Sequence, residues 1–153
     1  MDDRLFRTAM GKFATGVTVV TTEKDGEIFG MTANAFVSVS LDPKLVLISI
    51  DEKATINPKV GEVGKFAISI LNEDQEHLSN HFAGRDKDNT EIDFDRFNDL
   101  PVIPGVIATI TCNVYDTIIA GDHTLYIGEV TDLRMEDGNP LAFFNGKYTR
   151  LVE

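Results

Sequence analysis

The chain has 153 residues, a formal net charge of −11 at pH 7 and a hydrophobic fraction of 42%. This length suits a single domain over residues 1–153, and the negative charge disfavours nucleic acid as a partner because a phosphate backbone would be repelled. No apolar run is long enough to cross a bilayer, and no secretory signal is visible. The single Cys112 cannot form an intramolecular disulfide, which fits a reducing compartment. We therefore expect a cytoplasmic protein.

The N-terminal residues predict a short amphipathic helix. Asp2 and Asp3 stand where carboxylates favour the start of a helix, and apolar residues follow at helical spacing. We expect this helix to cover part of the core. Its apolar residues are Leu5, Phe6, Ala9, Met10 and Phe13.

β-rich segments begin near residue 17. Residues 17–22 and 27–32 are predicted strands, and the pair Asp25-Gly26 between them is typical of a hairpin turn. The nearly continuous apolar run 45–50 indicates a strand buried on both faces, and 66–71 indicates another central strand.

The next segment contains a predicted capping box, in which Asn72 would begin a short helix with Gln75 as its third residue. The stretch 83–104 is rich in acidic residues and has few apolar ones, so we expect a surface excursion, either solvated chain or a lid or interface arm. The amino-acid sequence does not indicate a role for the acidic part of this stretch, residues 85–99.

Clean alternation over 106–115 predicts a strand with Cys112 on its apolar face. Further strands are expected over 123–133 and 141–144, the latter followed by an Asn145-Gly146 turn. Six or so long strands with a few short helices predict a mainly β protein, a closed or nearly closed antiparallel barrel.

The stretch 30–43 departs from the pattern of a strand that only packs. Small or polar residues stand at Gly30, Thr32, Asn34 and Ser38, where a backbone could approach a flat ligand closely. We interpret it as a binding surface. Because the chain is acidic, an anionic cofactor would need backbone N–H groups, hydroxyls and a few local cations.

Metal and nucleophile chemistry find little support. His77 and His81 lie four apart on a predicted helix, but no third ligand accompanies them, so we expect no metal site. The chain has no G-x-S-x-G, G-x-G-x-x-G or phosphate-loop motif, which leaves chemistry supplied by a bound cofactor. For His123, at the start of a strand and so at the barrel rim, both a functional and a merely solvated role stay open.

Several motifs in order closely resemble the short-chain flavin reductase family, the reductase components of two-component flavin-dependent monooxygenases. The resemblance covers nearly the whole chain and implies an FMN-binding split β-barrel that works as a homodimer, with each site near the subunit interface. The matching segments are RTAMGKFATGVTVVTT at 7–22, GMTANAFVSVSLDP at 30–43, FAISIL at 66–71, LSNHFAG at 78–84, GDHTLYIGEV at 121–130 and PLAFFNGKY at 140–148.

The resemblance also implies roles for individual residues. Two positions depart from the family pattern: Ala35, where Ser is common, and Lys53-Ala54-Thr55, where Ser-x-Thr is common. The isoalloxazine would be lined by Thr32, Ala33, Asn34 and Ala35, together with Ser49 and Ile50. The ribityl or phosphate end would meet Lys53 and Thr55, and the flavin would be closed over by Phe82 and Gly84. The nicotinamide would be faced by His123 and Tyr148.

The implied function is that of an NAD(P)H:flavin oxidoreductase. It would transfer a hydride from NADH or NADPH to free FMN or FAD, with His123 orienting the nicotinamide, and supply reduced flavin to a separate monooxygenase or other acceptor. Two alternatives stay open: an electron carrier or oxidase of the same fold that holds FMN tightly, and a non-catalytic flavin-binding dimer.

Overall fold

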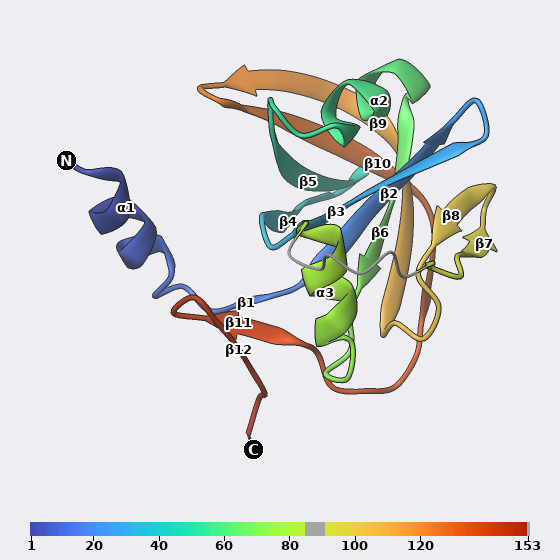
Figure 1. The fold of residues 1–153 in the computed structure, drawn as a ribbon. Helices are drawn as coiled ribbons and strands as arrows, with labels where there is room; N and C mark the ends of the chain where they lie inside the picture. Colours follow the sequence, from blue (N-terminus) through green and yellow to red (C-terminus); the bar gives the residue numbers. More distant parts are fainter. Residues whose placement is uncertain (85–90, 153) are drawn as a thin grey trace.

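The computed structural model describes residues 1–84 and 91–152, and its elements are shown in Figure 1. Within these ranges no helix is long and apolar enough to span a membrane. The described helices are α1 (Asp3–Met10), α2 (Ile56–Val63) and α3 (Glu76–Phe82). The strands of the large sheet are β2 (Thr18–Lys24), β3 (Glu27–Ala33), β4 (Phe36–Leu41), β5 (Lys44–Asp51), β6 (Lys65–Ile70), β9 (Ala108–Ala120) and β10 (His123–Met135).

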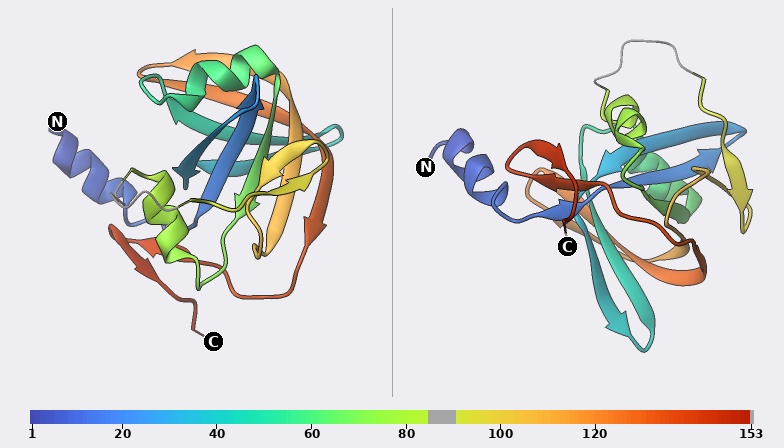
Figure 2. Two further views of the ribbon diagram at one scale, coloured as in Figure 1. Left: turned by 45° about the vertical axis from the view of Figure 1, so that its right-hand side comes forward. Right: turned by 90° about the horizontal axis from the view of Figure 1, so that it is seen from below.

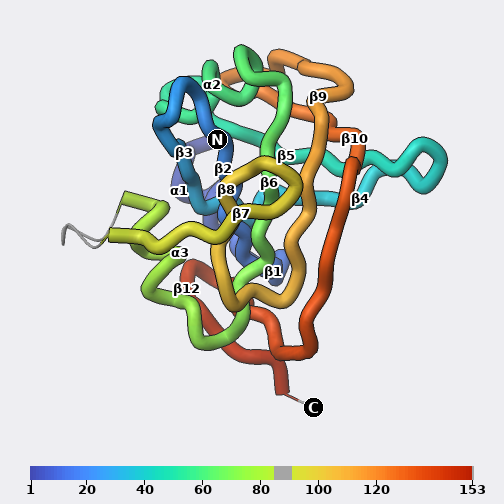
Figure 3. The backbone as a smooth tube through the Cα atoms, turned by 90° about the vertical axis from the view of Figure 1, so that its right-hand side faces the viewer, coloured from blue at the N-terminus to red at the C-terminus, as the bar shows by residue number. Residues whose placement is uncertain are grey.

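The large sheet is antiparallel throughout, in the order β3-β2-β6-β9-β10-β5-β4. It curves until β3 approaches β5, and α2 lies at one end of the resulting barrel (Figures 1 and 3). The buried cluster takes side chains from six of these strands and from α2, as the interior of a barrel requires. The predicted mainly β fold with a few short helices is therefore confirmed. Members of the cluster include Val20, Ala33, Ile48, Ile50, Ile56, Val60, Phe66, Ile68, Cys112 and Tyr126.

The sequence located the turns well. Asp25 and Gly26 have φ values of 53° and 80°, and they join β2 to β3 as the predicted hairpin. Asn145 and Gly146, with φ values of 55° and 76°, likewise join the two short strands near the C-terminus. Side chains of this kind tolerate positive φ, which is why these pairs mark turns in a sequence.

A small second sheet packs with α3 beside β2. It consists of β1 (Thr15–Gly16), β11 (Ala142–Phe144) and β12 (Lys147–Thr149), in the order β1-β11-β12. A second buried cluster, built around Val19, Leu71 and Leu141, joins these parts. The C-terminal strands thereby lie against the helix that follows β6 (Figure 1).

Only one of the two hydrogen bonds of the predicted capping box forms, and the helix begins later than expected. The Asn72 backbone N–H donates to Gln75 Oε1 at 2.9 Å, and Asn72 Oδ1 accepts from the Asp74 N–H at 2.7 Å. These bonds close a turn over residues 72–75, and α3 starts only at Glu76. The side chains of Asn72 and Gln75 therefore close a turn before the helix rather than capping its first turn.

The excursion 83–104 is more ordered at its end than expected. Its first part, 85–90, lies outside the described residues. Strands β7 (Asp95–Phe97) and β8 (Leu100–Val102) form a hairpin, and the whole of β8 is buried. Thr21 Oγ1 donates to the Pro101 carbonyl at 2.5 Å, which ties the hairpin to β2. The expectation of a solvated surface segment is therefore wrong for this part, because Leu100 and Val102 of β8 and the following Ile103 are buried in the core.

Helix α1 forms as predicted but does not cover the core. The Asp2 carboxylate accepts from the Leu5 N–H at 2.7 Å and caps the helix, yet none of the residues of α1 is buried. Figure 2 shows α1 projecting from the barrel. Its apolar side chains, including Phe6 and Met10, are exposed, so the helix contributes an unpaired apolar face.

Candidate functional site

The stretch 30–43 divides into the end of β3, a two-residue link and β4. The link, Asn34 and Ala35, is exposed. The Ser49 N–H donates to the Ala35 carbonyl at 3.2 Å, so the link is fastened to β5. Ala33 and Ile50 lie in the barrel core, which leaves chiefly their backbone for any ligand. The structure thus brings Asn34, Ala35 and Ser49 together at an open strand end.

A hollow of about 760 Å³ lies on one side of this link, between α1 with the following segment and the start of β4. Its walls are mainly apolar, and Arg7 is the only charged residue among those that line it. An apolar hollow beside an exposed backbone suits a flat ring system. The lining includes Phe6, Met10, Phe13, Asn34, Ala35, Val37, Leu47 and Phe143.

A smaller hollow of about 130 Å³ adjoins the first one, since Asn34 and Phe143 line both. It lies between β3, α3 and β12. Its remaining residues are Val17, Thr32, Ser79, Ala83 and Tyr148.

Hydrogen bonds fix the walls of this smaller hollow. Thr32 Oγ1 donates to the Ser79 carbonyl at 2.6 Å, and Ser79 Oγ lies 2.6 Å from the Tyr148 hydroxyl. The Tyr148 hydroxyl also donates to Asn80 Oδ1 at 3.2 Å. Two predicted site residues, Thr32 and Tyr148, are therefore held by one turn of α3. Sequence reasoning did not select Ser79, because a serine on a partly apolar helix carries no signal of its own.

Phe82 and Gly84 lie at the end of α3. The Phe82 ring packs against Gly30, where an added Cβ would be only 2.7 Å from Cε1. Gly84 is exposed with φ at 73°, a conformation that favours glycine. The sequence indicated that another group approaches the backbone closely at Gly30, and the structure shows such a contact. The group is the Phe82 ring of the same chain rather than a ligand.

Lys53 and Thr55 lie on the turn between β5 and α2. The Lys53 N–H donates to Asp51 Oδ1 at 2.9 Å, and both Lys53 and Thr55 are exposed. Thr55 occupies the N-cap position of α2 but its side chain makes no capping hydrogen bond. A lysine and an uncommitted hydroxyl beside the positive end of a helix dipole can together meet an anion.

A buried polar network holds this turn in place. Asn57 Nδ2 donates to the carbonyls of Ile50 and Asp51, each at 3.2 Å, and to Thr124 Oγ1 at 3.1 Å. The Tyr126 hydroxyl donates to the Asn57 carbonyl at 2.7 Å and lies 3.0 Å from Asn57 Oδ1. Asn57 therefore connects α2 to the ends of β5 and β10.

His123 begins β10 and pairs across the sheet with Asp51. Its Nδ1 lies 2.8 Å from Asp122 Oδ1. That hydrogen bond, together with the charges of His123 and Lys53, holds the pKa of Asp122 below its usual range. With Nδ1 engaged, Nε2 is the imidazole atom left to meet a ligand.

One chain does not bring all the predicted residues into one cavity. Thr32, Asn34, Ala35 and Tyr148 line the two adjoining hollows, whereas Lys53, Thr55 and His123 line neither of them. His123 lies at the rim of the large sheet and Tyr148 in the small sheet.

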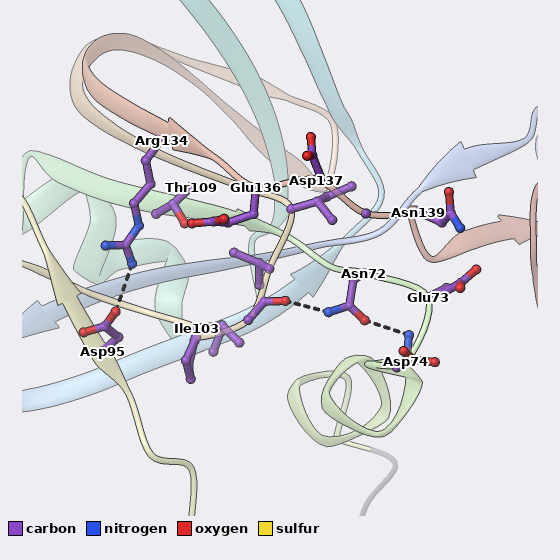
Figure 4. Close-up of a pocket in the computed structure, with 15 residues that line it drawn as sticks. Asn72, Glu73, Asp74, Asp95, Ile103, Thr109, Arg134, Glu136, Asp137 and Asn139 are labelled. Atoms are coloured by element: carbon purple, nitrogen blue, oxygen red, sulfur yellow. Dashed lines mark hydrogen bonds and ion pairs between the residues drawn. The ribbon is translucent and has the colours of Figure 1, made fainter.

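A further hollow of about 650 Å³ contains none of the predicted site residues (Figure 4). Carboxylates dominate it, and Arg134 donates to Asp95 Oδ2 at 2.9 Å, so its cation is already paired. A flavin phosphate would be repelled there. The acidic residues are Glu73, Asp74, Asp95, Glu136 and Asp137.

Comparison with known proteins decides the family. The model of the flavin reductase like domain matches residues 10–152. The chain belongs to this family. The resemblance drawn from the sequence motifs is therefore confirmed.

Three relatives of this flavin reductase like domain are similar over most of their length. An NADH-dependent flavin reductase of Rhodococcus sp is 45% identical over 148 residues, covering 95% of this chain and 84% of the relative. The reductase component of 4-hydroxyphenylacetate 3-monooxygenase from Thermus thermophilus is 38% identical, covering 96% and 95%. The solved structure of flavin reductase PheA2 in its native state is 55% identical, with a TM-score of 0.98 and full coverage of both chains.

Proposed function

We propose that the protein is an NADH-dependent flavin reductase that uses free FMN or FAD as its substrate. The observation that carries this proposal is the exposed Asn34–Ala35 link, fastened to β5 and flanked by an apolar hollow, in a chain of the flavin reductase family. The flavin supplies the hydride acceptor and NADH the hydride, so the protein needs to bind and align two rings rather than to provide an acid or base.

The ring end of the flavin would lie along residues 32–35. Asn34 and Ala35 are exposed there, and the Ser49 N–H supports the link from β5. The apolar walls of the adjoining hollow would exclude water from the ring. Thr32 would line the ring from the side of α3, with Phe82 and Gly84 closing over it.

The phosphate end would lie at the start of α2. Lys53 offers a cation and Thr55 an uncommitted hydroxyl at the positive end of the α2 dipole, where Pro58 has no N–H and the Asn57 N–H already donates to the Ala54 carbonyl at 3.0 Å. These groups can bind a phosphate locally although the whole chain carries a charge of −11.

His123 and Tyr148 would contact the nicotinamide of NADH. Asp122 holds His123 through Nδ1, so Nε2 can meet the carboxamide of the nicotinamide. The Tyr148 ring is fixed by its hydroxyl contacts and packs edge-on against Phe143 at 5.2 Å between ring centres. Both residues would orient NADH.

The working form would be a homodimer. Leu5 and Phe6 of α1 and Val37 and Leu41 of β4 are exposed, with exposures between 50% and 79%. Apolar side chains of this number on two neighbouring elements favour burial against another protein surface. A second copy seated there would cover the larger hollow, which α1 and β4 both line. Sedimentation equilibrium should give twice the chain mass, and Leu41→Lys should weaken the association.

Reduced flavin would pass to a separate monooxygenase, a proposal supported by the Thermus thermophilus relative, which is named as the reductase component of a monooxygenase. The same site could instead hold FMN tightly, as in an electron carrier or oxidase, or bind flavin without turnover. We infer NADH rather than NADPH as the hydride donor, because the Rhodococcus relative is named an NADH-dependent flavin reductase.

The direct test follows nicotinamide absorbance in air with NADH or NADPH, with and without excess FMN, FAD or riboflavin. Turnover that requires added flavin and prefers NADH supports the proposal. A yellow protein whose NADH oxidation does not depend on added flavin would favour the carrier or oxidase, and a protein that binds flavin without oxidising NADH would favour the non-catalytic dimer.

A further inference from the structure

We propose that Ser79 is a positioning residue that sets NADH binding by fixing the ring of Tyr148. This inference rests on the proposed function, because Tyr148 contacts NADH only if the protein is a flavin reductase. Ser79 lines the smaller hollow but is 0% exposed, so it would act through Tyr148 rather than by touching a cofactor.

Two contacts from α3 hold the Tyr148 hydroxyl. The hydroxyl donates to Asn80 Oδ1 at 3.2 Å, and it lies 2.6 Å from Ser79 Oγ, a contact in which either oxygen can donate. The phenol oxygen is thereby held by two side chains of α3, those of Ser79 and Asn80.

The Tyr148 ring has a third fixed contact. Its ring packs edge-on against Phe143, at 5.2 Å and an interplanar angle of 67°. With the hydroxyl held by α3 and the ring flank by β11, the remaining part of the side chain faces the smaller hollow. A ring that is already fixed loses little conformational freedom when NADH binds.

Ser79 holds two walls of this hollow by different atoms. Its side chain meets Tyr148, whereas its backbone carbonyl accepts the hydroxyl of Thr32 at 2.6 Å. Replacing Ser79 by Ala removes the first bond and keeps the second. The substitution should therefore separate NADH binding from flavin binding.

The experiment compares Ser79→Ala with Ser69→Ala. Ser69 is also fully buried, and its Oγ accepts from the Ile103 N–H at 3.2 Å, but it lines neither hollow beside Asn34. Each variant loses one buried hydrogen bond, so both should lower the melting temperature by a similar amount. We expect KM for NADH to rise about fivefold to tenfold in Ser79→Ala alone, with the flavin Kd, measured by fluorescence quenching, changed less than twofold.

Tyr148→Phe supplies the reciprocal change without creating a buried cavity, and it keeps the test open if Ser79→Ala does not fold. It should raise KM for NADH at least as much, and the double variant should be no worse than Tyr148→Phe, because both substitutions remove one shared bond. Additive effects, or equal KM values in Ser79→Ala and Ser69→Ala, would overturn the inference.

A readout without cofactors is available because the chain has three tyrosines. In protein labelled with fluorotyrosine, the ¹⁹F signal of Tyr148 should broaden or shift in Ser79→Ala and stay unchanged in Ser69→Ala. An unchanged Tyr148 signal in Ser79→Ala contradicts the positioning role. Failure of the proposed function can be told apart from failure of this inference, because in that case the unaltered protein would not oxidise NADH in the presence of flavin.

Discussion

The ring of Phe82 occupies the space that a side chain at Gly30 would need. A Cβ at residue 30 would lie 2.7 Å from Phe82 Cε1 and 2.8 Å from Cδ1. The contact joins β3 to α3, and α3 carries Ser79, which holds both Thr32 and Tyr148. Packing on β3 is thereby connected to the geometry of the candidate site.

Gly30→Ala should therefore displace Phe82 and α3. We expect a loss of about 1–3 kcal/mol in the free energy of unfolding, as for other overpacked sites, and weaker flavin binding. Urea unfolding and flavin fluorescence quenching measure the two effects. Gly16→Ala is the stability control, since nothing lies within 4 Å of a Cβ there. Equal stability of the two variants would contradict the close contact.

Asn57→Ala should destabilise the chain and loosen the turn that carries Lys53 and Thr55. Three carbonyl or hydroxyl acceptors lose their donor, so we expect a loss of roughly 3 kcal/mol in urea unfolding and a several-fold rise in the flavin Kd. Tyr126→Phe removes only the contacts to α2 and leaves the turn bonded, so it should cost about 1–2 kcal/mol with an unchanged flavin Kd. Loss of flavin affinity in both variants would argue against a specific role for the turn.

Asp122 should make a pH-dependent contribution to stability. Its hydrogen bond to His123 lowers its pKa in the folded chain, so the ionised carboxylate favours folding. The contribution is complete above the ordinary pKa of 3.8 and is lost as the pH falls through the lowered value. Urea midpoints of the unaltered protein and Asp122→Asn should differ at pH 5 and converge in more acidic solution. A difference that persists unchanged at pH 2 would contradict this account.

Cys112 should be chemically inert in the folded protein. Burial raises the pKa of its thiol to about 12, so its thiolate fraction at neutral pH is lower than that of a free cysteine by a factor of roughly 10³. A chromogenic disulfide reagent should release no colour from the native protein within minutes and one equivalent per chain in denaturant. Rapid reaction of the native protein would show that the thiol is accessible.

The sequence predicted the parts of the fold that depend on local chemistry. Asp25-Gly26 and the alternation around Cys112 identify a turn and a strand because conformational preference and side-chain period act over a few residues. The burial of β8 and the exposure of α1 were missed, since both depend on what lies across from the segment in space. A helix with one apolar face has the same pattern whether it covers its own core or a partner.

The candidate site divides in the same way. Thr32, Asn34 and Tyr148 were selected through ordered family motifs, and the structure brings them to adjoining hollows. Ser79 and Asn57 were not selected, because a buried hydroxyl or amide is defined by its partners in other elements. No spacing along the chain reveals these partners.

The central claim is that free flavin is a substrate that the protein reduces and releases. Its most direct test mixes the protein without oxygen with excess NADH and a tenfold molar excess of FMN or FAD, and follows the flavin absorbance near 450 nm. We expect the whole flavin pool to bleach, over many turnovers per chain. Bleaching that stops at one flavin per chain, or none at all, would contradict the claim.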